Sequence, residues 1–461
     1  MIADLKPYAG YKESGLPWLG RVPEHWVTKR GKSYLATIDE RSKTGREELL
    51  TVSSARGVVP RSSANVSMFK AESYAGHKLC WPGDLVINSL WAWGGGLGVS
   101  QHHGIISTAY SVYRSRPSAQ INPRFLHELV RSSAFHWELQ VRSKGVWISR
   151  LQLTDTAFLD APIPLPPPHE QAAIVRFLDW SNGRLERAIR AKRKVIALLG
   201  EQKQAIIHRA VTRGLDPSVP LKPSGIPWLG DIPEHWGIVR NSALFANRVE
   251  QGIPGLPVLQ VSLRSGITAE AFDQFGRPKR LIADHARYKL VRGCDLAYNA
   301  MRMWQGAVGV APADGLVSPA YVVLRPRSGS EPRFFELFFR TAIYKQQVNR
   351  HSTGIVSDRN RLYWENFKQM PNILPPIDEQ LAICRLVQTE TGELMSAISR
   401  LEREIELLRE YRTRLVADVV TGKLDVREAA ARLPEEDEPE ITGEYVDAGD
   451  DVELADDEAM A

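Results

Sequence analysis

Short alternating runs of apolar and polar residues, interrupted by Gly and Pro, fill a zone of about 150 residues at the start of each half of the chain. DLVINSLW (84–91) is one such run, and YVVLRPR (321–327) is a similar one later in the chain. Runs of this kind predict short strands joined by turns. The segment 122–142 predicts a helix, with Asn122 placed to cap it and Pro123 in its first turn. Segment 331–350 has the same pattern. Each zone is therefore expected to be a mixed α+β domain.

A second pattern follows each zone. After the proline-rich stretches PLPPPHEQ (164–171) and LPPIDEQ (374–380), the chain runs for about 40 residues with no Pro and almost no Gly. Apolar residues recur there at heptad spacing, which places them on one stripe that must be buried against another helix. The seam residues predicted from this spacing are Leu185, Ile189, Ile196, Leu199, Ile206, Leu394, Ile398, Leu401, Ile405, Leu408 and Leu415.

Two arrangements are compatible with this stripe. The two helices can form one antiparallel coiled coil that joins two globular domains, as a dumbbell with pseudo-two-fold symmetry. Alternatively, each helix can pack on the surface of its own domain. The length of the helices and their flanks favour the coiled coil, because residues 184–213 are strongly basic and residues 393–422 are of mixed charge.

The whole pattern is written twice. SGLPWLGRVPEHW (14–26) and SGIPWLGDIPEHW (224–236) share ten of thirteen positions, and GIISTAYSVYR (104–114) matches GLVSPAYVVLR (315–325). Matching segments lie 209 to 211 residues apart throughout, which indicates a tandem duplication of one fold. The expected domains are, in chain order, residues 1–167, a first mixed α/β domain; 168–215, a central helix; 216–376, a second such domain; 377–430, a distal helix; and 431–461, an acidic tail.

The charge is distributed unevenly. Residues 434–461 contain thirteen Asp or Glu and no Lys or Arg, so the rest of the chain carries 59 Lys and Arg against 41 acids, a net charge of +18. A body this basic favours a polyanionic partner, most simply nucleic acid. A basic surface that only aids solubility is the alternative. The tail is expected to be disordered and solubilising, since it is highly charged and poor in aromatic residues.

Enzyme and metal motifs are missing from the sequence. GKS (31–33) has Trp26 where a phosphate-binding loop needs glycine, and NPRF (122–125) has Arg124 where the amino-methyltransferase motif has proline. His102 and His103 lack a second ligand cluster, so loop or hydrogen-bonding roles are expected. His25 and His235, placed identically in PEHW, are expected to pack or to form hydrogen bonds. Three scattered cysteines, no apolar h-region and no long apolar run predict a cytoplasmic protein.

The duplicated phrases carry a family likeness. SG(L/I)PWLG followed by (V/I)PEHW, and the PPxxEQ entry into a long helix, resemble the specificity (S) subunit of type I restriction–modification systems over roughly residues 10–428. The resemblance implies two target-recognition domains, each reading one half of a bipartite double-stranded DNA sequence. It also implies that the two helices set the gap between half-sites and dock two methyltransferase (modification) subunits. Restriction (helicase–nuclease) subunits would join them.

The resemblance implies no catalytic residue, metal or cofactor in this chain. S-adenosylmethionine, ATP and Mg are expected on the partner subunits. Two other hypotheses stay open: a coiled-coil DNA-binding regulator that works without enzyme partners, and an enzyme whose centre is not recognised.

Candidate DNA contacts come from positions where the halves align but differ in side chain, because different half-sites need different readers. We call these the reading segments: 54–56 with 263–265, 90–93 with 301–304, and 144–150 with 353–359. Arg150 and Arg359 recur and are the candidate phosphate clamps. The other candidate base or backbone contacts are Arg56, Lys144, Arg264, Arg302, Gln305 and Asp358. Packing is favoured over base stacking for Trp91, Trp93 and Trp304. The recurring Pro17, Trp18 and Trp26, with their second copies, are expected to pack each domain onto the helices.

Overall fold

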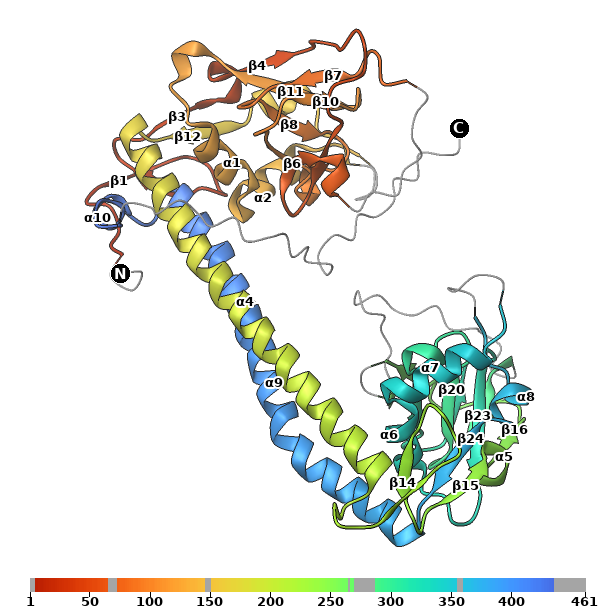
Figure 1. The fold of residues 1–461 in the computed structure, drawn as a ribbon. Coiled ribbons are helices and arrows are strands. Elements are labelled where there is room, and N and C mark those ends of the chain that lie inside the picture. The colour runs from red at the N-terminus through yellow and green to blue at the C-terminus, as the bar shows by residue number, and fades with distance from the viewer. Residues whose placement is uncertain are drawn as a thin grey trace. The chain divides into compact units, whose positions relative to one another are not determined.

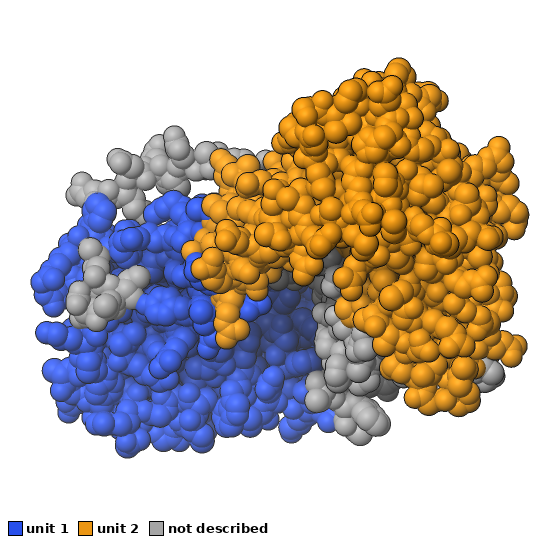
Figure 2. Space-filling view, turned by 90° about the horizontal axis from the view of Figure 1, so that it is seen from below, with its two compact units in different colours: residues 1–191, 404–461 blue, residues 192–403 orange. Residues whose placement is uncertain are grey.

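A computed structural model describes residues 5–64, 73–145, 151–263, 266–268, 287–354 and 360–434. The chain divides into two compact units (Figure 2). Unit 1 comprises residues 1–191 and 404–461, and unit 2 comprises residues 192–403. Each unit therefore contains one mixed α/β domain and part of both long helices.

The central sheet of unit 1 is antiparallel and has four strands, in the order β4 (Leu35–Ile38), β11 (Tyr110–Ser115), β8 (Leu85–Asn88) and β9 (Leu97–Val99). Four strand pairs accompany it: β1 (Tyr11–Glu13) with β2 (Arg21–Pro23), β3 (Val27–Arg30) with β12 (Pro162–Leu165), β5 (Leu50–Ser53) with β6 (Gly57–Pro60), and β7 (Lys78–Cys80) with β10 (Gly104–Ile106). Its short helices are α1 (Pro123–Arg131), α2 (Ser133–Arg142) and α3 (Asp155–Leu159) (Figure 1).

Unit 2 repeats this topology. Its four-stranded sheet has the order β16 (Phe245–Arg248), β23 (Tyr321–Pro326), β20 (Leu296–Asn299) and β21 (Val308–Val310). The strand pairs are β13 (Leu221–Pro223) with β14 (Asp231–Pro233), β15 (Gly237–Arg240) with β24 (Pro371–Leu374), β17 (Gln260–Ser262) with β18 (Gly266–Thr268), and β19 (Lys289–Val291) with β22 (Gly315–Val317). Its short helices are α5 (Asn241–Leu244), α6 (Pro332–Phe339), α7 (Ala342–His351) and α8 (Trp364–Phe367).

The duplication extends to the strand register. Tyr110 pairs with Asn88 in the first sheet, and Tyr321 pairs with Asn299 in the second. A one-residue slip would turn every side chain to the opposite face of the strand. Identical registers therefore mean that the two halves share one fold, as their offset predicted.

Two long helices, α4 (Pro168–Arg213) and α9 (Ile377–Val420), join the domains, and α10 (Arg427–Ala431) follows. Within each unit a segment of α4 lies beside a segment of α9, and the two run antiparallel (Figure 1). In unit 1 Arg412 forms an ion pair with Glu186 at 2.6 Å. In unit 2 the Lys203 ammonium lies 2.8 Å from the Met395 sulfur.

None of the predicted seam side chains is exposed. Leu185, Ile189, Ile405 and Leu415 are buried, and the remaining members of the seam are half-buried. By contrast, Leu198 and Leu407 lie on the same helices and are each 54% exposed. The contact of each seam residue with the other helix stays a prediction.

Both long helices end at a glycine in the left-handed region. Gly214 follows α4 with φ +76°, and Gly422 follows α9 with φ +77°. A Cβ on Gly422 would lie 2.4 Å from Pro23 Cδ, so a side chain there would also collide with the first duplicated phrase. The distal helix thus ends at Val420, earlier than residue 430, because this turn redirects the chain.

The helix expected over 122–142 is two helices. Asn122 caps α1 as predicted, since its side chain accepts from the backbone N–H groups of Arg124 and Phe125. Ser132 has extended backbone geometry and its hydroxyl accepts from the Phe135 N–H, which ends α1 and caps α2. Thr341 does the same between α6 and α7. A serine or threonine inside a helical pattern can cap a new helix, and here this local bond prevails.

Each hydrophobic core continues from the domain onto the long helices. In unit 1 Trp26, Tyr113 and Phe125 belong to one buried cluster with Phe177 of α4 and Val419 of α9. Trp236, Tyr298 and Phe334 form the corresponding cluster with Val211 and Ile383 in unit 2. The long helices are therefore part of the domain core in each unit. None of the described helices is long and apolar enough to cross a membrane.

Candidate nucleic-acid interface

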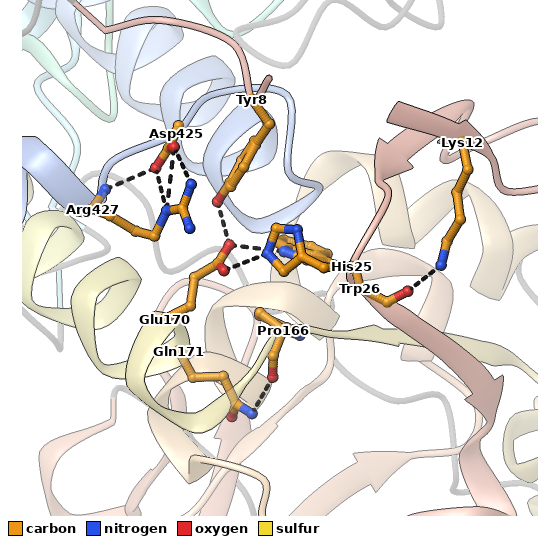
Figure 3. Close-up of polar contacts among 9 residues, drawn as sticks. All are labelled: Tyr8, Lys12, His25, Trp26, Pro166, Glu170, Gln171, Asp425 and Arg427. Carbon is orange, nitrogen blue, oxygen red and sulfur yellow. Dashed lines mark hydrogen bonds and ion pairs between the residues drawn. The ribbon is translucent and has the colours of Figure 1, made fainter. Parts of the chain in front are cut away.

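The duplicated PEHW phrase and the PPxxEQ phrase meet at the start of each long helix. In unit 1 the fully buried Glu170 carboxylate accepts from the Trp26 indole at 2.8 Å and from the Tyr8 hydroxyl at 2.5 Å. Its second oxygen lies 2.7 Å from His25 Nε2 (Figure 3). We call this cluster the Glu170 joint. Burial and then the hydrogen bond to Glu170 raise the pKa of the Tyr8 phenol, which keeps it a donor.

The neighbouring glutamine fixes the other side of the same turn. The Gln171 amide donates to the Pro166 carbonyl at 2.8 Å, and its oxygen accepts from the Asn122 N–H at 2.7 Å (Figure 3 draws the first of these bonds). Gln171 thereby ties α4 to the residue that caps α1. Gln380 makes the equivalent contacts with Pro375 and Glu331 in unit 2.

Unit 2 has a reduced copy of the joint. Glu379 accepts from the Trp236 indole at 3.0 Å and lies 2.7 Å from His235 Nε2. Ser218 occupies the sequence position that matches Tyr8. The hydrogen-bonding role predicted for His25 and His235 is confirmed, as is the packing of Trp26 onto a long helix. The Trp18 ring packs at 5.3 Å on Phe135 of α2, and it lies against the core cluster that the domain shares with the long helices.

Glu170 and Gln171 belong to the PPxxEQ phrase, but the sequence alone assigned them no role. Their partners lie far away in the sequence, and Glu170 is separated from His25 by 145 residues. The only available signal was that the EQ pair recurs after 209 residues, within one residue of the offset of PEHW.

The described reading segments of unit 1 lie near one another. The 90–93 segment overlaps the 3-10 turn Ala92–Gly94, and the Ser89 carbonyl just before the segment accepts from the Leu153 N–H at 2.9 Å. Lys144 pairs with Gln152 in an antiparallel bridge, which brings the base of the third segment to the same place. Arg56 is exposed at the turn between β5 and β6. A Cβ on Gly98 of β9 would lie 3.0 Å from Gly57 Cα, so this turn packs closely on the sheet.

Unit 2 assembles the matching segments in the same way. The Leu362 N–H donates to the Ala300 carbonyl at 2.9 Å, and Thr353 bridges to Arg361. Arg302 and Gln305 are exposed on and beside the 3-10 turn Met303–Gln305. Lys144 is likewise exposed in unit 1. Arg150, Arg264, Asp358 and Arg359 lie outside the described residues, so these candidate contacts stay predictions.

The tryptophans of these turns make internal contacts. Trp93 donates its indole N–H to the Leu90 carbonyl at 3.2 Å, and Trp304 donates to Met301 at 3.0 Å. Trp91 and Trp93 pack with ring centroids 4.7 Å apart. Because both turns use the same bond, these indoles fix the shape of the turn, which agrees with a packing role.

The histidine pair His102–His103 lies in a loop. The His102 N–H donates to the Ser100 hydroxyl at 3.1 Å, and the His103 ring packs 4.0 Å from the Trp81 ring. Among the described residues, no group of three His, Cys, Asp or Glu side chains is placed to hold a metal ion.

Of the known proteins compared with this chain, only solved structures match it. No protein-family model and no curated protein matches the chain. A chain from a structure concerning complex assembly and conformational transition of the type I R-M (restriction–modification) system matches with a TM-score of 0.58 at 17% identity. The match covers 87% of this chain and 99% of that one.

Two further solved structures match with lower scores. The HsdS subunit from Thermoanaerobacter tengcongensis has 19% identity and a TM-score of 0.42 over 87% of this chain and 98% of its own. The S subunit of a type I restriction–modification system from M. genitalium has 10% identity and a TM-score of 0.33 over 86% and 96%. The first of these three structures, with a TM-score of 0.58, has the same fold as this chain.

Proposed function

We propose that the chain is the non-catalytic DNA-specificity subunit of a type I restriction–modification complex. Each domain reads one half of a bipartite target, and the paired helices α4 and α9 set the gap between the halves. The helices also dock two methyltransferase subunits, which bring S-adenosylmethionine, and restriction subunits join with ATP and Mg.

One observation carries this proposal. Two domains of identical topology and register present loops at equivalent places, and the scaffold residues of these loops recur whereas the exposed side chains differ. At one turn the exposed Arg56 aligns with Ser265 of unit 2. At the other turn Trp91 and Gly94 align with the exposed Arg302 and Gln305 of unit 2. A scaffold kept in duplicate with different exposed groups suits the reading of two different half-sites. The net charge of +18 before the tail supports a DNA partner.

The test is to purify the chain with an adenine methyltransferase subunit encoded beside it and to map the adenines that the complex methylates in a pool of randomised duplex DNA. A bipartite motif with a fixed gap is expected, and neither protein alone should produce it. A chain that selects DNA tightly by itself and ignores the methyltransferase would instead be the stand-alone regulator. Methyl transfer by the purified chain alone would mean that the chain is an enzyme.

A further inference from the structure

An arginine at the end of the first short helix reaches two loops in each domain. In unit 1 the half-buried Arg131 ends α1, and its guanidinium donates to the turn between β5 and β6 and to the start of β9. Its shortest bonds go to the carbonyls of Ser54 at 2.6 Å, Leu97 at 2.7 Å and Ala55 at 2.9 Å. Longer contacts reach Gly95 at 3.3 Å and Ser53 at 3.5 Å. One side chain thereby joins the reading segment 54–56 to residues 95–97, which follow the reading segment 90–93.

Unit 2 makes the same connection with different neighbours. Arg340 donates to the carbonyls of Leu263 and, at 3.5 Å, Val308. These residues align with Ser54 and Leu97. The acceptors are backbone carbonyls in both units, so the contact survives where the side chains of the reading segment change.

The residue one helical turn before the arginine forms a hydrogen bond with the strand beneath these loops. His127 Nδ1 accepts from the Val99 N–H at 3.2 Å, and Glu336 accepts from the Val310 N–H at 3.3 Å. A Cβ on Gly57 would lie 2.9 Å from the His127 ring. Gly57 also has φ +77°. The turn is thus held from below by close packing as well as by hydrogen bonds.

We propose that Arg131 and Arg340 are positioning residues for sequence reading, which we call the loop arginines. Each holds the β-hairpin turn of its domain at a fixed separation from the strand that follows the 3-10 turn, β9 or β21, so that side chains on both turns reach base edges together. This inference rests on the proposed function. A guanidinium suits the role because its planar fork donates in several directions at once, whereas an ammonium cannot reproduce that geometry. Bidentate base contacts in turn need their donors held in place.

The test compares Arg131→Lys, Arg340→Lys and wild-type chain, each assembled with the methyltransferase subunit, in the same selection from randomised duplex DNA. Arg131→Lys keeps the charge and is expected to weaken discrimination on the order of tenfold in one half of the motif only. Arg340→Lys should weaken the other half. Affinity for non-specific duplex DNA and the urea midpoint should stay unchanged, and amide exchange around residues 54–57 and 95–97 should become faster in Arg131→Lys.

Arg116→Lys is the matched control. Arg116 follows β11 in the same domain and also donates to a backbone carbonyl, that of Lys32 at 3.0 Å. Neither residue belongs to a reading segment, so this variant should behave as wild type. Unchanged discrimination in Arg131→Lys would overturn the inference, and so would a loss that comes with a lower urea midpoint, because the arginine would then serve the fold. A wild-type complex that selects no sequence would overturn the proposed function itself and the inference with it.

Discussion

At the scale of single residues, a buried carboxylate links each domain to its long helix. The PEHW copies are identical, yet the two joints differ in the burial of the carboxylate and in its hydrogen-bond donors. Glu170 is fully buried and accepts from Tyr8 and Trp26, whereas the Glu379 side chain is 20% exposed and Ser218 replaces the tyrosine. A buried donor that loses its acceptor costs more free energy than a bond in contact with water.

Replacing these carboxylates by leucine should therefore destabilise the units unequally. Glu170→Leu leaves the Trp26 and Tyr8 donors buried without an acceptor, and we expect a loss of about 2–5 kcal/mol in the free energy of unfolding. Glu379→Leu should cost less. Urea titration followed by tryptophan fluorescence measures both variants. Equal losses, or none, would show that the joint does not stabilise the fold as its geometry indicates.

His127 gives the first unit a dependence on pH. Burial and then the Arg131 charge lower the pKa of His127 to about 4, and its bond from the Val99 N–H requires an unprotonated Nδ1. A histidine with a lowered folded pKa stabilises the fold when neutral. That stability is complete above the unfolded pKa of about 6.5 and is lost as the pH falls towards 4.

His127→Gln should remove this part of the acid destabilisation. Glutamine does not titrate, and Glu336 shows that a side chain of this length reaches the equivalent N–H in unit 2. Between pH 7 and pH 4.5 wild type should lose on the order of 1–3 kcal/mol more than the variant. Urea midpoints across that range provide the measurement, and parallel curves would contradict the assignment.

At the scale of elements, the repeating apolar pattern predicted the two long helices. It did not predict the helix ends, which depend on local side-chain hydrogen bonds or on contacts between distant residues. Heptad spacing located both long helices, because apolar residues that recur at this period over about 40 residues are typical of a buried helix face. The break at Ser132 was missed, since the serine hydroxyl bonds locally and leaves the apolar pattern intact. The end of α9 at Val420 depends on Gly422 meeting Pro23, a contact between distant parts of the chain.

The helix pair should depend on Ile189. This side chain is 3% exposed on α4, in the segment that belongs to unit 1, whereas Leu198 on the same helix is 54% exposed. Ile189→Asp should destabilise the fold by about 2–5 kcal/mol, through lost apolar burial and an unpaired charge. Leu198→Asp should stay within about 0.5 kcal/mol of wild type. Similar urea midpoints for the two variants would mean that the seam is assigned to the wrong face.

At the scale of the whole molecule, the nearly constant offset between copies predicted two equivalent domains, and the registers of the two sheets confirm this. The offset did not predict that the segment after α9 pairs with the segment before β2 to complete the first domain. The Asp425 N–H donates to the Lys6 carbonyl at 2.8 Å, and the Tyr11 hydroxyl donates to the Lys423 carbonyl at 3.0 Å. In unit 2 the residues equivalent to both of these segments follow Gly214 in one continuous stretch of chain. Pairing between termini leaves no periodic signal in a sequence.

This equivalence permits a test of how specificity is divided. Replacing residues 224–374 by a copy of residues 14–165 places the first set of reading segments in both domains. The exchanged segment ends at residue 374, before the EQ pair of the second copy. Its PEHW histidine and tryptophan should therefore bind Glu379 as the native His235 and Trp236 do. Because each domain reads one half-site in the proposed function, the chimera assembled with the methyltransferase subunit should select a motif whose two halves have the same sequence. Adenine mapping in randomised duplex DNA gives the result. An unchanged second half would mean that bases are read by parts of the chain outside the exchanged segment.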